Sequence, residues 1–107
     1  MRILLDECVP RPLKRELPGH DVRTVPEMGW SGKKNGELLQ LMLPANFDVF
    51  LTVDQNLRFQ QDLRAANLAV VVLVAPTNRF VDLVPLVASV LTALATIQPG
   101  DLVEISV

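Results

Sequence analysis

Apolar residues in this chain occur in short, unbroken runs separated by segments of mixed polarity. The clearest runs are residues 2–5 (RILL) and 68–74 (LAVVVLV). The first stops at Asp6, and the second stops just before Pro76. A short aliphatic run bounded by polar residues or Pro is typical of a strand buried on both faces of a parallel sheet. The same pattern predicts five strands, at residues 2–5, 21–25, 48–53, 68–74 and 102–107.

The segments between these runs have the features of helices. Leu13 and Leu17 are spaced four residues apart and are followed by Pro18-Gly19, which ends a helix, while Asn35 is a suitable N-cap. Pro85 interrupts a long apolar stripe, so we expect a short turn up to Val84 and a new helix that starts near Pro85. Helices are predicted at residues 11–17, 36–42, 57–66 and 79–97.

The alternation of strands and helices determines the expected fold class. Strand–helix–strand units connect parallel strands through right-handed crossovers. The length of 107 residues is that of one domain. We therefore expect a single domain over residues 1–107, built as a three-layer α/β/α sandwich around a mainly parallel sheet of four or five strands.

Composition narrows the class of protein further. Half of the residues are apolar and 21% are charged, which excludes a disordered chain. Cys8 is the single cysteine, so an internal disulfide is excluded, and no N-terminal signal peptide is visible. We expect a cytoplasmic protein.

Residues 79–97 have nearly the length of a membrane span, but Arg79, Asp82 and Pro85 break the segment, so we expect no membrane contact. The sparse charge of the predicted helix at 85–97 instead predicts packing on a second copy or on a partner protein.

Charge is distributed unevenly along the chain. All ten Lys and Arg residues lie within residues 2–79, which sum to +1 with nine acids, whereas residues 80–107 carry three acids and sum to −3. A polyanion is therefore expected to bind the N-terminal three-quarters of the chain. A basic rim for phosphate groups is predicted there, although such residues are most often simply solvated. Its members are Arg11, Lys14, Arg15, Lys33 and Lys34.

Acidic residues follow two of the predicted strands. Asp6 and Glu7 follow the first strand, and Asp54 follows the third. In parallel sheets, ligands bind beyond the carboxyl ends of the strands. If these two strands are neighbours, Asp6 and Asp54 meet, and two close carboxylates need a proton or a cation between them. Mg²⁺ or Mn²⁺ suits such an oxygen-rich site. The alternative for each acid is a structural cap on the following turn or helix.

Four segments carry a resemblance to a known family. They are ILLDECVP (3–10), DVRTVPEMGW (21–30), KNGELLQL (34–41) and FDVFLTVDQNL (47–57). In their order and motifs they resemble the small PIN-like proteins of the DUF5615 group, which are relatives of PIN-domain toxins and of the Mut7-C domain. The resemblance implies a PIN-like fold with strand order 2-1-3-4 and the last strand at an edge. It also implies a Mg²⁺- or Mn²⁺-dependent ribonuclease that is the toxin of a toxin–antitoxin pair.

The resemblance also implies residue roles. Asp6 matches the acid of the first strand, and Asp54 matches the acid of the Thr-x-Asp motif. Asn35 and Asn56 stand where the family often has further acids, and we expect Glu37 to take the role of the helix acid. An Asn oxygen can ligate a hard cation without adding charge, so we expect a weaker metal site than in an ordinary PIN nuclease. Glu7 is ranked behind Asp6, because consecutive strand residues point to opposite sides.

Two other functions fit the same pattern. A phosphoacceptor receiver domain also has acids after the first and third strands, but it needs a Lys late in the chain, and none follows Lys34. A non-catalytic PIN-like binding module, with its metal site lost to the two Asn residues, is the stronger alternative. Metal binding distinguishes this module from a nuclease.

Overall fold

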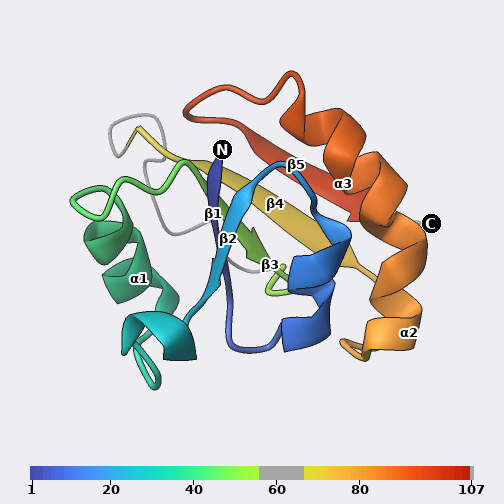
Figure 1. Cartoon of the computed structure of the whole chain (residues 1–107), viewed down its shortest axis with the longest axis horizontal. Helices are drawn as coiled ribbons and strands as arrows, with labels where there is room; N and C mark the ends of the chain where they lie inside the picture. Colours follow the sequence, from blue (N-terminus) through green and yellow to red (C-terminus); the bar gives the residue numbers. More distant parts are fainter. Residues whose placement is uncertain (56–66, 107) are drawn as a thin grey trace.

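The computed structural model describes residues 1–55 and 67–106. It is an α/β fold whose five-stranded sheet is parallel throughout, with helices on both faces (Figure 1). The strands are β1 (Arg2–Leu5), β2 (Asp21–Thr24), β3 (Val49–Thr52), β4 (Ala69–Val74) and β5 (Leu102–Ser106). Their order is β2-β1-β3-β4-β5. The predicted α/β sandwich is confirmed, and so are the strand order and the edge position of the last strand.

Helical segments lie between β1 and β2, between β2 and β3, and between β4 and β5. They are the 3-10 helices η1 (Arg11–Glu16), η2 (Pro26–Met28) and η4 (Val84–Leu86), and the α-helices α1 (Asn35–Met42), α2 (Phe80–Leu83) and α3 (Val87–Leu94). None of the helices in the described part of the chain is long and apolar enough to cross a membrane.

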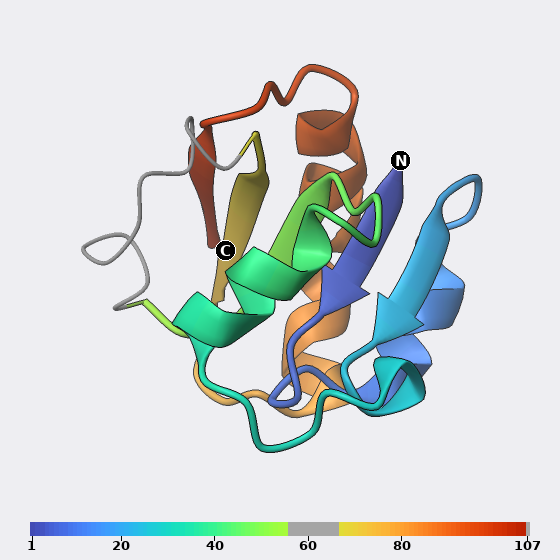
Figure 2. The same ribbon diagram turned by 90° about the vertical axis from the view of Figure 1, so that its left-hand side faces the viewer.

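Alternating side chains of the strands fill two cores, one on each face of the sheet. On one face, Ile3 and Leu51 lie in a buried cluster with Leu13 of η1 and Val90 of α3. On the other face, Phe50 belongs to a second cluster that contains Leu38, Leu39 and Met42 of α1. The two views show these layers, with α1 on one side of the sheet and α2 and α3 on the other (Figures 1 and 2). Both faces of the sheet are buried, which explains the unbroken apolar runs.

Three of the four predicted helices lie in the described residues, and each differs in part from its prediction. The segment predicted as a helix at 11–17 is the 3-10 helix η1, which starts where the Leu13 N–H bonds the Pro10 carbonyl three residues back. Asn35 is the first residue of α1, and Lys34 occupies the N-cap position predicted for Asn35. The predicted break near Pro85 is confirmed, because the segment 79–97 is divided into α2, η4 and α3, with Pro85 inside the 3-10 helix; α3 ends at Leu94 and not at residue 97. The predicted helix at 57–66 lies outside the described residues.

The carboxyl ends of β1 and β3 form the topological switch point of the sheet. From β1 the chain moves to one side to form β2, and then returns to form β3 on the other side. Leu5 of β1 is in register with Leu51 of β3, and the Asp6 N–H continues the ladder by bonding the Leu51 carbonyl at 3.0 Å. Ligands of open α/β sheets bind at such a point.

Candidate functional site

Asp6 is a buried carboxylate at the switch point. Its side chain follows β1 directly and is 9% exposed. One oxygen, Oδ1, accepts the Glu7 backbone N–H at 2.8 Å. The other, Oδ2, accepts the Thr52 hydroxyl at 2.7 Å and the Cys8 thiol at 3.4 Å. Three donors therefore fix the orientation of the Asp6 carboxylate before any ligand binds.

Thr52 connects Asp6 to the acid that follows β3. The side chain of this last β3 residue is fully buried, and its hydroxyl donates to Asp6 while accepting the Asp54 backbone N–H at 3.0 Å. Asn35, at the start of α1, donates from Nδ2 to Asp54 Oδ2 at 2.8 Å. The result is a continuous hydrogen-bonded chain, Asp6–Thr52–Asp54–Asn35, which brings together residues of β1, β3 and α1.

Two other predicted acids lie outside this network. Glu37 is exposed on the first turn of α1, and its carboxylate accepts the Lys34 N–H at 3.2 Å, so it caps the helix. Glu7 is also exposed, and its carboxylate accepts the Gly32 N–H at 2.7 Å. Because β1 ends at Leu5, the alternation of strand side chains does not extend to Glu7. Asn56 lies outside the described residues.

A hard cation requires several oxygen donors that lie close together. Within residues 1–55 and 67–106, no group of three or more His, Cys, Asp or Glu side chains gathers closely enough to hold a metal ion. Mg²⁺ is commonly bound by one or two carboxylates, with water and substrate phosphate completing its shell. Asp6, Asp54 and the amide oxygen of Asn35 are oxygen donors of that kind, so these residues fit a weakly held Mg²⁺ or Mn²⁺.

Cys8 lies beside Asp6 but is not activated. Burial of the thiol, followed by the negative charge of Asp6, raises the pKa of Cys8 above its usual value. The Cys8 carbonyl accepts the Asn78 side-chain amide at 2.9 Å, which ties the turn after β1 to the segment before α2. A nucleophilic cysteine needs a lowered pKa, and Cys8 instead packs against the core on one face of the sheet.

The predicted basic residues divide into two groups. Arg11, Lys14 and Arg15 line a pocket of about 590 Å³ with Pro12 on η1. Lys33 and Lys34 are exposed on the loop before α1. This loop contacts the turn after β1, because the Gly32 N–H donates to the Glu7 carboxylate at 2.7 Å.

A second pocket, of about 330 Å³, lies directly beside Asp6. Glu27 contributes to its wall and receives the Lys14 ammonium on both carboxylate oxygens, each at 2.9 Å. The bond from Lys14, and next the backbone N–H of Thr24, lower the pKa of Glu27 to about 2. Eight residues line this pocket: Asp6, Glu7, Val9, Pro10, Arg11, Thr24, Pro26 and Glu27.

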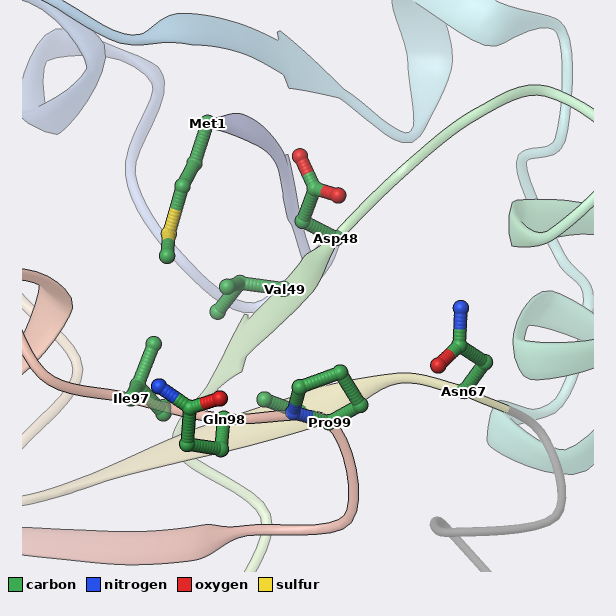
Figure 3. Close-up of a pocket in the computed structure, with 8 residues that line it drawn as sticks. Met1, Asp48, Val49, Asn67, Ile97, Gln98 and Pro99 are labelled. Carbon is green, nitrogen blue, oxygen red and sulfur yellow. The ribbon is translucent and has the colours of Figure 1, made fainter.

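A smaller pocket of about 170 Å³ lies at the amino ends of the strands (Figure 3). Its floor includes the buried side chains of Val49 and Ile97, and Asp48 stands at its rim. One oxygen of Asp48 already accepts the Arg2 N–H at 2.8 Å. Because ligands of parallel sheets bind at the carboxyl ends, this pocket is not the candidate site.

Thr52 is the residue of this network that the sequence alone did not single out. Its signal was present in the Thr-x-Asp spacing before Asp54 and in its position as a polar residue on a buried strand. Buried hydroxyls require hydrogen-bond partners, which directs attention to the acids nearby.

Comparison of the chain with models of protein families, with curated proteins and with solved structures found no match.

Proposed function

We propose that this protein is a Mg²⁺- or Mn²⁺-dependent endoribonuclease with its active site at the carboxyl ends of β1 and β3. The observation that carries the proposal is the Thr52 hydroxyl, which joins the Asp6 carboxylate to the backbone of Asp54 at the switch point. A buried hydroxyl in this position ties the segment after β3 to the Asp6 carboxylate, and one or two carboxylates are the protein ligands that Mg²⁺ commonly uses.

Each residue of the network has a definite role in the proposal. Asp6 and Asp54 would hold the cation, and Asn35 orients Asp54 through its amide N–H while its oxygen remains a neutral ligand. When bound, the cation would polarise a phosphate oxygen and lower the pKa of a water molecule. Thr52 fixes Asp6, so no reorganisation of that carboxylate is needed during the reaction.

RNA is proposed as the substrate, because exposed basic residues lie on two segments that adjoin the site. Arg11 and Arg15 lie on η1, and Lys33 with Lys34 lies on the loop before α1, whereas Lys14 of the predicted rim is paired with Glu27. Contacts of Lys and Arg with phosphates supply most of the affinity for a nucleic acid chain. With the resemblance to PIN-like toxins, we further propose an antitoxin protein as the partner.

A non-catalytic binding module is the second candidate, and one contact favours it. The Asn35 amide donates to Asp54 Oδ2 at 2.8 Å, which satisfies this oxygen without a metal ion. An acid in the place of Asn35 would repel Asp54 and require a cation between them. The present pair is compatible with a stable, metal-free site.

Thermal melts and cleavage assays distinguish the two candidates. Wild type, Asp6→Asn and a control, Asp48→Asn, are melted in EDTA and in Mn²⁺ and then assayed on single-stranded RNA. Asp48 is an exposed acid at the opposite edge of the sheet, which makes it a matched control. A nuclease shows Mn²⁺ stabilisation and cleavage in wild type and Asp48→Asn, and neither in Asp6→Asn. If Mn²⁺ stabilises none of the three proteins and no RNA is cleaved, the nuclease is excluded in favour of the binding module.

A further inference from the structure

Arg11 stands where the two pockets at η1 adjoin. It lines the basic pocket with Lys14 and Arg15, and it also lines the pocket that contains Asp6. Lys14 and Arg15 line the first of these pockets and are not among the residues that line the second. A phosphate chain that lies along η1 therefore meets Arg11 last before it reaches Asp6.

The charges of the Asp6 pocket make this position important. Asp6, Glu7 and Glu27 contribute carboxylates to the lining, and Arg11 is the one cation among the eight lining residues. The charge of Glu27 is balanced by Lys14, so a phosphodiester that enters would be repelled chiefly by Asp6 and Glu7, even when a divalent cation is bound to one of them. A guanidinium offsets this repulsion and can hold two phosphate oxygens at once.

The three basic residues of η1 differ in how their charge is used. Lys14 is paired with both oxygens of the Glu27 carboxylate, each at 2.9 Å. Arg11 and Arg15 take part in none of the ion pairs formed between described residues, and both are exposed. Two guanidinium groups are thus available to a phosphate chain, whereas the ammonium of Lys14 is already neutralised.

The backbone holds Arg11 in a defined place. Arg11 opens η1 between Pro10 and Pro12, whose rings fix φ, and the Leu13 N–H closes the first turn on the Pro10 carbonyl at 3.0 Å. The backbone that presents the Arg11 side chain is therefore more restricted than an ordinary loop.

From these observations we infer that Arg11 binds the phosphate that lies beside Asp6, while Arg15 binds a more distant phosphate and Lys14 contributes little. This inference rests on the proposed nuclease function. It assigns different effects to three neighbouring residues that are all basic, so their variants serve as controls for one another.

The test compares wild type, Arg11→Gln, Arg15→Gln and Lys14→Gln in cleavage of a single-stranded RNA with Mn²⁺. For Arg11→Gln we expect kcat to fall by about 10- to 100-fold, because a phosphate that is poorly placed reacts slowly. Arg15→Gln raises KM a few-fold at unchanged kcat, and Lys14→Gln stays within about twofold of wild type. Circular dichroism melts verify that each variant is folded.

Salt dependence of RNA binding provides a readout that does not need cleavage. Loss of one phosphate contact reduces the slope of log K against log salt by about 0.7 for a single strand. We expect this reduction in Arg11→Gln and Arg15→Gln, and an unchanged slope in Lys14→Gln.

The outcomes separate the two proposals. If wild type cleaves RNA and Arg11→Gln retains the wild-type kcat, the role of Arg11 is wrong and the nuclease stands. If wild type does not cleave RNA in Mn²⁺, the proposed nuclease function is wrong, and the salt dependence of RNA binding then tests phosphate binding by Arg11. A slope in Arg11→Gln equal to that of wild type overturns phosphate binding by Arg11 as well.

Discussion

Replacement of Thr52 by Val tests whether the hydrogen-bonded chain holds the site together. Val keeps the branched shape of Thr in a fully buried position but removes the hydroxyl. Two hydrogen bonds are lost, the 2.7 Å bond to Asp6 Oδ2 and the 3.0 Å bond from the Asp54 N–H. The substitution therefore removes the connection between β1 and the segment after β3 without creating a cavity.

The expected loss of stability follows from the partners of the hydroxyl. A hydrogen bond to an ionised acceptor contributes about 1.5–3 kcal/mol to stability. The Asp54 N–H is only partly buried and can turn to water, so its lost bond adds about 0.5–1 kcal/mol. We expect Thr52→Val to lower the free energy of unfolding by about 2–4 kcal/mol. Thr52→Ser keeps the hydroxyl and loses one buried methyl group, which costs about 1 kcal/mol.

Urea denaturation at neutral pH measures both losses, and a double-mutant cycle with Asp6→Asn isolates the coupling between the two side chains. We expect a coupling free energy of at least about 1 kcal/mol, because the residues share one hydrogen bond. Mn²⁺ binding to folded Thr52→Val should weaken as well, since the Asp6 carboxylate loses the donor on Oδ2. If Thr52→Val is as stable as Thr52→Ser and the coupling is zero, the chain does not support the site.

Three further predictions concern acid stability, thiol reactivity and assembly. Glu27 has a folded-state pKa near 2, so the stability that it contributes is present above its ordinary pKa of 4.5 and is lost as the pH falls towards 2. Glu27→Gln, which also disrupts the partly exposed pair with Lys14, should destabilise the protein by at most about 1 kcal/mol in urea melts at pH 7, and by less at pH 3. Iodoacetamide should modify Cys8 more slowly than it modifies free cysteine at pH 8, because the raised pKa leaves less thiolate, and Asp6→Asn should increase the rate. Light scattering should detect self-association through α3, which carries no charged residue, whereas a strict monomer at high concentration would leave a partner protein as the ligand of this helix.

The fold was largely predictable, because its signals are local. Residues 69–74 form a strand buried on both faces. The sequence there is an unbroken aliphatic run without a polar side chain that could face water. Strand directions followed from the helices that connect the strands, since such crossovers join parallel strands. Element type was less certain at η1, where two prolines in a short connection favoured a 3-10 helix over the predicted α-helix.

The acids at the strand ends were also visible in the sequence, because a carboxylate directly after a buried strand has a known place at the edge of a sheet. The sequence by itself determined that Asp6 and Asp54 lie at the carboxyl edge. Their mutual arrangement depended on tertiary structure. The bond between Thr52 and Asp6 joins residues 46 positions apart, and the bond between Asn35 and Asp54 joins residues 19 apart. Such contacts leave no periodicity in the sequence. Asn35 was therefore predicted to cap its own helix, whereas folding places its amide on Asp54 and leaves capping of α1 to Glu37.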